Sequence, residues 1–214
     1  MVCAMPNTNP SVVDENSLKV AQNAAKKNAM CDYALFVGAS ADNAKTVGKL
    51  AKKAAALKMY LNCTFSTLEL SDMSLWKDHF VNWPKTRPIC VHAEGHTLAA
   101  VLLFAHLYGR HVHFCHVSRR DEILLIKEAK EKGMEVTCEV TPHHLFLTED
   151  DVPEDLRSVK PALGSKKDQE ALWENMDVID CFATDHAPHL LEEKKGKGSP
   201  PGFPGYYNVI VMID

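Results

Sequence analysis

Hydrophobic residues along the chain follow two alternating patterns. Short apolar runs rich in β-branched residues alternate with longer stretches in which apolar residues recur every three or four positions. The apolar runs predict seven strands, at 1–6, 32–38, 57–62, 88–93, 112–117, 135–141 and 178–184. The periodic stretches predict helices near 14–29, 41–55, 71–82, 95–109, 119–132 and 168–176. This alternation is typical of βαβ units, in which helices cover both faces of a parallel sheet.

Capping residues refine the predicted boundaries. Helix starts are expected at Ser71, at Ser118 and at Ser165, which Asp168 follows three residues later. Gly133 is expected to end the fifth helix. The glycines and prolines of 192–205 argue against regular structure there, whereas 206–214 resembles the start of another helix.

The strand count separates two parallel architectures. A doubly wound sheet usually carries a glycine-rich phosphate loop after an early strand, and the sequence has none. A (β/α)₈ barrel needs one more strand and about 250 residues. The sequence begins directly on a strand. We therefore expect residues 1–214 to form a single α/β TIM-type barrel domain with seven of eight strands, which lacks the first strand and the C-terminal helices.

Composition narrows the class of protein. With 46% hydrophobic and 24% charged residues, the chain has the composition of a soluble globular protein. A net charge of −4 without a basic stripe argues against nucleic-acid binding, and no apolar run is long enough for a membrane span. Seven scattered cysteines without a CxxC pair indicate reduced thiols in the cytoplasm; those within strand-like runs, expected to be buried, are Cys3, Cys90, Cys115, Cys138 and Cys181.

Polar residues that could carry chemistry collect where the predicted strands end. In a parallel barrel these positions share one mouth, where the active site lies. The set comprises Asn7, Lys58, His92, Cys115, His116, Glu139 and Asp185. Taken singly, each has a simpler explanation, such as a packed histidine, a core cysteine or a turn aspartate. Two histidines and an aspartate on different strands would nevertheless converge, and imidazole with carboxylate suits hydrolytic zinc.

Other histidines give weaker signals. His143 and His144 could be polar loop residues. His79, His106 and His111 lie where helix or turn surface is expected, and we assign them no role.

Lys58 stands in the run "LKMYLN", which otherwise predicts a buried strand. One interpretation places it at a strand end with its ammonium group in water. The other interpretation is a desolvated lysine, whose lowered pKa leaves the amine partly neutral and nucleophilic. Such an amine can add carbon dioxide, and the resulting carbamate could bridge two metal ions.

Seven motifs together resemble the dihydroorotase domain of the animal multifunctional pyrimidine-synthesis proteins, within the cyclic amidohydrolase superfamily. They are "MPNT", "LKMYLN", "VHAE", "FCHV", "EVTPHHLFL", "CFATDHAPH" and "PPGFPG", in order from residue 1 to about residue 206. The resemblance implies a zinc-dependent barrel that reversibly cyclises N-carbamoyl-L-aspartate to L-dihydroorotate. It also implies a small-molecule substrate, a larger multifunctional polypeptide and a homo-oligomer.

The resemblance also implies roles for individual residues. Lys58 would be the carboxylated lysine between two zinc ions, His92 and His116 would hold one ion, and Asp185 would hold the other and act as general acid and base. Cys115 and Glu139 match residues around a third zinc in animal members. Thr64 and Phe65 match a catalytic loop that closes over substrate. The positions that match substrate contacts are Asn7, Lys160, His189, Pro201 and Gly202.

Two departures from the family pattern stand out. The family's opening H-x-H pair has no counterpart in these 214 residues, so the chain as given could be inactive. The family's V-R-P-E-L-G is "VKPALG" here, and Lys160 keeps the charge of the expected arginine without its bidentate geometry. Two alternatives remain open: a dihydropyrimidinase- or allantoinase-type amidohydrolase, and a non-catalytic dihydroorotase-like assembly module.

Overall fold

The computed structural model describes residues 1–64 and 67–205, and these fall into two compact units. The first unit comprises 1–93 and 100–113, and the second comprises 94–99 and the rest of the described chain from residue 114. The division passes through helix α3 (His96–Tyr108) and strand β6 (Val112–Phe114). The predicted helix at 206–214 and the loop residue Phe65 lie outside the described residues.

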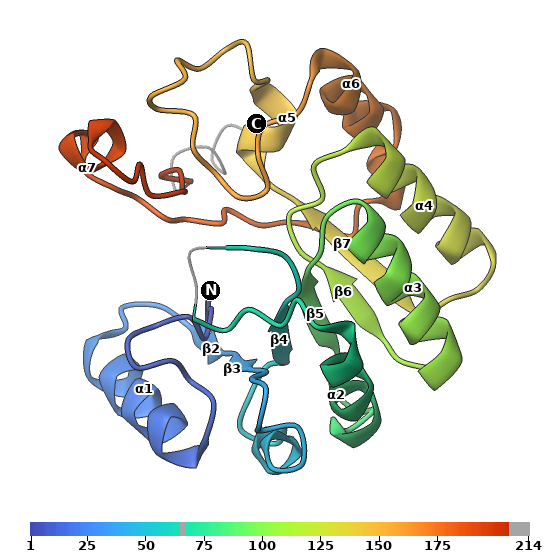
Figure 1. Cartoon of the computed structure of the whole chain (residues 1–214). Helices are drawn as coiled ribbons and strands as arrows, with labels where there is room; N and C mark the ends of the chain where they lie inside the picture. Colours follow the sequence, from blue (N-terminus) through green and yellow to red (C-terminus); the bar gives the residue numbers. More distant parts are fainter. Residues whose placement is uncertain (65–66, 206–214) are drawn as a thin grey trace. The chain divides into compact units, whose positions relative to one another are not determined.

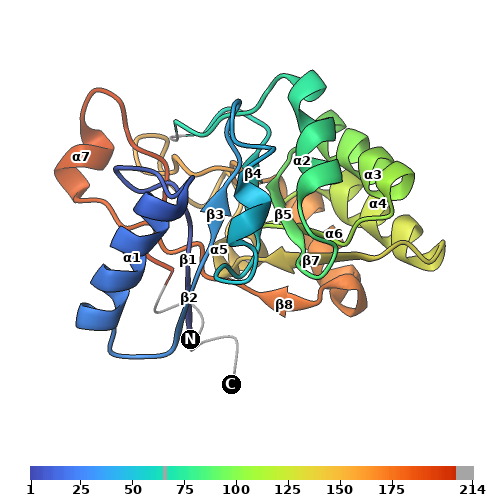
Figure 2. The same cartoon turned by 90° about the horizontal axis from the view of Figure 1, so that it is seen from below.

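The first unit is built on parallel strands (Figure 1). Its remaining elements, in chain order, are β1 (Val2–Ala4), α1 (Glu15–Asn28), β2 (Tyr33–Leu35), β3 (Val37–Gly38), the 3₁₀ helix η1 (Val47–Leu50), β4 (Leu57–Tyr60), the 3₁₀ helix η2 (Met73–Leu75), α2 (Trp76–Asn82) and β5 (Ile89–His92). Strands β1 and β2 form a two-stranded sheet, and α1 lies beside it in both views (Figure 2). Strand β4 pairs in parallel with β3 and β5. All four residues of β4 and of β5 are buried, as expected for a parallel sheet covered on both faces.

The second unit alternates strands and helices in the same way. Its elements are α4 (Arg120–Glu131), β7 (Val136–Val140), α5 (Pro142–Phe146), α6 (Lys166–Glu174), the 3₁₀ helix η3 (Met176–Val178), β8 (Cys181–Phe182) and α7 (Leu191–Lys195). Strands β7 and β8 pair in parallel, and α4 packs beside α6 (Figure 1). Helix α4 buries Ile123, Ile126 and Ala129 on one face, at the spacing of an amphipathic helix.

All seven predicted strands are present, with 32–38 divided into β2 and β3. The parallel strands and intervening helices confirm the predicted α/β class. Of the predicted helix signals, Ser165 and Asp168 form a capping box at the start of α6. Gly133 follows α4 with φ +76°, a backbone conformation that favours glycine.

Other local predictions are wrong. The stretch 41–55 contains turns and only the short η1, because Gly48 lowers helix propensity and packs closely against the carbonyl of Asn82. Asp72, not Ser71, caps the segment that leads into α2. Glu122 rather than the Ser118 hydroxyl accepts the backbone N–H groups at the start of α4.

The segment 192–205, predicted to lack regular structure, includes most of α7. The carboxylate of Glu193 accepts the backbone N–H of Leu190 at 2.8 Å and so caps this short helix. The prolines and glycines lie beyond its end.

Burial corrects three further expectations. All seven cysteines are free thiols, but Cys3 and Cys181, on the short strands β1 and β8, are exposed. His79 is buried rather than on the surface, and a ring nitrogen lies 2.9 Å from the carbonyl of Ser40.

None of the helices in the described part of the chain is both long and apolar enough to cross a bilayer.

Candidate metal centre

Lys58 is buried in the middle of strand β4. Only 2% of the residue is exposed, so the interpretation that its ammonium group reaches water at a strand end is wrong. Its Nζ lies 5.1 Å from the ring centroid of Tyr60, two residues along the same strand. This cation–π contact partly compensates the ammonium group for lost hydration.

His92 ends the neighbouring strand β5 and is equally buried. Its backbone pairs with Tyr60, and the two rings lie 6.5 Å apart between centroids. The aromatic ring of Tyr60 therefore contacts both predicted metal ligands of the first unit. Strand pairing places Lys58 and His92 on adjacent strands, two residues out of register.

His116 and Asp185 follow β6 and β8 in the second unit, and both adopt left-handed backbone conformations. Their φ angles are +38° and +44°, and they are the non-glycine residues with positive φ in the described structure. Such conformations cost about 1–3 kcal/mol each and concentrate at functional sites, where surrounding structure enforces them. His116 is buried and Asp185 is half-buried.

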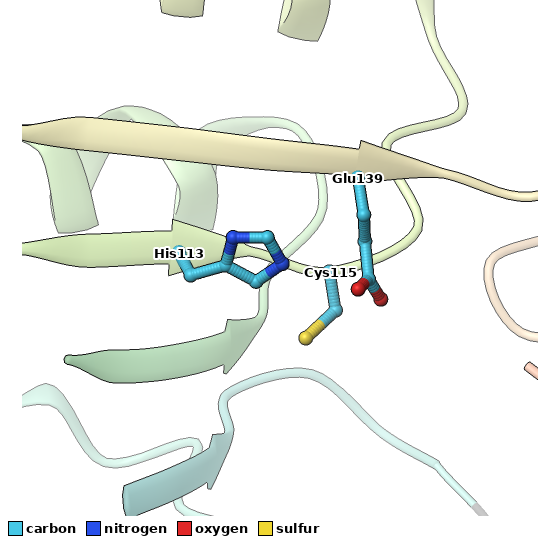
Figure 3. Close-up of side chains that lie close together, drawn as sticks. All are labelled: His113, Cys115 and Glu139. Carbon is cyan, nitrogen blue, oxygen red and sulfur yellow. The ribbon is translucent and has the colours of Figure 1, made fainter. Parts of the chain in front are cut away.

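Three side chains form a compact donor cluster: His113 on β6, Cys115 directly after β6 and Glu139 on β7 (Figure 3). One ligand atom each from His113, Cys115 and Glu139 lies within 4.8 Å of the others. Imidazole, thiolate and carboxylate are the donors that zinc takes in proteins, and this set therefore fits a zinc ion. Cys138 points to the opposite face of β7, where burial raises the pKa of its thiol to about 12 and disfavours the thiolate.

Sequence reasoning selected Cys115 and Glu139 but missed His113. The signal was present, because residues two apart on a strand point to the same face and His113 precedes Cys115 by two.

Glu122 is a second residue that the sequence analysis missed. Its buried carboxylate accepts backbone N–H groups from Gly95 at 2.8 Å, Ser118 at 3.2 Å and Arg119 at 3.1 Å. Burial raises the pKa of Glu122, and these three donors oppose that shift. The segments that Glu122 joins directly follow His92 and His116 in sequence.

His143 and His144 lie on α5 and are buried, not polar loop residues. A ring nitrogen of His144 lies 2.7 Å from the Thr141 hydroxyl and the other lies 3.1 Å from the carbonyl of Pro161. Burial lowers the pKa of His144 to about 4 and that of His143 to about 3, so both are neutral at pH 7.

The predicted substrate contacts differ in exposure. Asn7, Lys160 and His189 are exposed, Pro201 is half-buried and Gly202 is buried, while Thr64 of the predicted catalytic loop is half-buried. In the second unit, a ring nitrogen of His189 lies 3.1 Å from the carbonyl of Pro201, which brings the "DHAPH" and "PPGFPG" segments together.

Comparison with known proteins finds relatives that align with the whole chain. The multifunctional protein CAD of Squalus acanthias is 55% identical over 216 aligned residues, which cover all of this chain. The inactive dihydroorotase-like domain of a CAD-like multifunctional protein from Chaetomium thermophilum superposes with a TM-score of 0.81 at 32% identity, over 99% of this chain. The chain is thus similar over its whole length to multifunctional CAD-type proteins, including a dihydroorotase-like domain.

The same comparisons limit what this similarity establishes. The chain spans 10% of the length of the shark protein and 61% of the fungal domain. An L-hydantoinase (dihydropyrimidinase) from Arthrobacter aurescens has a TM-score of 0.84 at 22% identity, over 94% of this chain and 54% of that one, which shows a shared fold alone. No model of a protein family matches the chain.

Proposed function

We propose that this chain supplies most of a zinc-dependent dihydroorotase site, which reversibly cyclises N-carbamoyl-L-aspartate to L-dihydroorotate. The observation that carries the proposal is the burial of Lys58 between Leu57 and Met59 on β4, next to the strand that ends in His92. A buried lysine amine is poised to add carbon dioxide, and the carbamate is an anion suited to bridging two cations.

The proposal assigns each predicted metal ligand to a zinc ion. Lys58 as its carbamate, His92, His116 and Asp185 would hold two zinc ions, and His113, Cys115 and Glu139 would hold a third. Bound zinc would polarise the carboxyl group that closes the ring and would lower the pKa of a coordinated water.

The chain's own side chains would position the substrate and move protons. Asp185 would take the proton from the carbamoyl nitrogen as the N–C bond forms and would deliver it to the departing hydroxide as water. The charge of Lys160 would attract the carboxylate groups of the substrate. Asn7 and His189 would form hydrogen bonds with its carboxylate and carbonyl groups. Thr64 and Phe65 would close over the substrate.

The proposal also covers the larger polypeptide to which this chain would belong. Because the shark relative is about ten times longer than this chain, we infer that the chain functions within a larger multifunctional protein. We also propose that this larger protein forms a homo-oligomer and that it lies in the cytoplasm.

The test uses the full-length natural polypeptide that carries this sequence. We expect ring closure of N-carbamoyl-L-aspartate, no hydrolysis of dihydrouracil, and two to three zinc ions per chain by elemental analysis. Hydrolysis of dihydrouracil without ring closure would instead indicate a dihydropyrimidinase-type enzyme.

A non-catalytic assembly role is the second candidate, and one observation favours it. The fungal domain that covers 99% of this chain at 32% identity is described as inactive. A metal-free and inactive full-length polypeptide would support this role and overturn the proposed enzyme.

A further inference from the structure

Lys194 is a buried lysine that the proposed chemistry does not use. It lies on α7 with 7% of its surface exposed, and burial lowers the pKa of its ammonium group. Its acceptors within the described chain are three backbone carbonyls: Ser158 at 2.5 Å, Pro200 at 3.0 Å and Gly202 at 3.2 Å. The next residue, Lys195, is exposed.

These carbonyls belong to two segments that carry predicted substrate contacts. Ser158 lies two residues before Lys160, whereas Pro200 and Gly202 flank Pro201. The N–H of Gly202 also donates to the carbonyl of Ser158 at 3.0 Å. One ammonium group therefore joins 158–160 to 200–202 through three of its hydrogen bonds.

Phe203 extends the connection to a third segment. Lys194 Nζ lies 5.4 Å from the centroid of its ring, and the ring meets the buried His143 edge to face at 5.3 Å. The carbonyl of Phe203 accepts the N–H of Ala187 at 3.0 Å, between Asp185 and His189. Lys194 and Phe203 together thus link three segments of the second unit that carry predicted substrate or metal contacts: 158–160, 185–189 and 200–203.

The physical chemistry explains why a lysine suits this position. Irregular backbone that is partly buried leaves carbonyl groups that need donors, and an ammonium group supplies three. Hydrogen bonds from a charged donor are stronger than those from a neutral donor. They offset the free-energy cost of removing the ammonium group from water only when the acceptors are held in place.

We propose that Lys194 is a positioning residue that holds segments 158–160 and 200–203 in the arrangement that binds the anionic substrate. This inference rests on the proposed dihydroorotase function. Lys194 itself does not touch the reacting atoms, because its three donors are engaged by backbone carbonyls.

The variant Lys194→Met keeps the apolar stem and removes the ammonium group, and Lys195→Met is the matched control. In the full-length polypeptide we expect Lys194→Met to raise KM for N-carbamoyl-L-aspartate about tenfold or more, the loss of roughly one charged hydrogen bond, with a much smaller change in kcat. Lys194→Arg should restore part of the affinity. Equal KM values in Lys194→Met and wild type, or a loss confined to kcat, would overturn the proposal.

Hydrogen exchange separates this inference from the proposed function. The amides of 158–160, Gly202 and Phe203 should exchange faster in Lys194→Met and remain unchanged in Lys195→Met, whether or not the polypeptide is active. Unchanged exchange in Lys194→Met would refute the positioning role. If Lys194→Met fails to fold, acetylation rates in the wild-type protein provide the test instead. The amine of Lys194 should react about tenfold more slowly than that of Lys195. Equal rates would contradict the proposal.

Discussion

The carboxylate of Glu122 accepts the backbone N–H of Gly95 at 2.8 Å. Because the same carboxylate accepts N–H groups from Ser118 and Arg119, it connects the segment after His92 to the segment after His116. A carboxylate offers acceptors only, which matches three converging N–H donors.

Glu122→Gln tests this relationship. The amide presents an NH₂ group that cannot accept from these donors, so at least one buried N–H loses its partner, at a cost of about 1–3 kcal/mol. We expect a lower melting temperature and a roughly 10–100-fold weaker zinc affinity, because residues that orient ligands typically have effects of that size. Glu128→Gln on the exposed face of α4 is the control and should match wild type.

Acid sensitivity should follow from His144. Histidine titrates near 6.5 in the unfolded chain, whereas burial lowers the pKa of folded His144 to about 4. The contribution of neutral His144 to the free energy of unfolding is therefore complete above pH 6.5. This contribution is lost as the pH falls towards 4, by on the order of 3 kcal/mol. His143, with a pKa lowered to about 3, acts in the same direction.

Unfolding free energies measured between pH 7 and 4 should therefore decrease less steeply in His144→Gln than in wild type. His106→Gln, at an exposed histidine of α3, should keep the wild-type pH dependence. An unchanged slope in His144→Gln would contradict the assignment of a neutral buried imidazole.

Lys58→Ala should abolish the proposed dihydroorotase activity in the full-length polypeptide. Removal of a ligand should exceed the roughly hundredfold loss typical for residues that only support one. A short carboxylic acid in solution should restore part of the activity by taking the place of the carbamate. Lys52→Ala, at an exposed lysine of the same unit, serves as control, and full activity in Lys58→Ala would show that no bridging carbamate operates.

Lys160→Arg should strengthen substrate binding. An arginine can bind a carboxylate through two parallel hydrogen bonds, whereas lysine acts as a point charge. We expect KM for N-carbamoyl-L-aspartate to fall about three- to tenfold, which corresponds to about 1 kcal/mol. Lys167→Arg, at an exposed lysine on α6, should leave KM unchanged, and a higher KM in Lys160→Arg would show that the site is adapted to lysine.

The sequence by itself determined the order of strands and helices and the fold class. All seven predicted strands are present, and the continuous apolar runs of β4 and β5 are buried at every residue, as a parallel sheet covered on both faces requires. It also pointed to the family, because the motifs at strand ends are contiguous in sequence. The extent of a predicted helix was less predictable where a residue far along the chain packs against it, as the carbonyl of Asn82 does against Gly48.

Only the tertiary structure decided which polar side chains are buried and what they contact. Burial of Lys58, the proximity of His113 to Cys115 and Glu139, and the carbonyl acceptors of Lys194 all depend on residues distant along the chain or on neighbouring strands. The cost of burying a charged or polar group depends on partners that three-dimensional packing brings together, and a linear pattern of residues does not specify those partners.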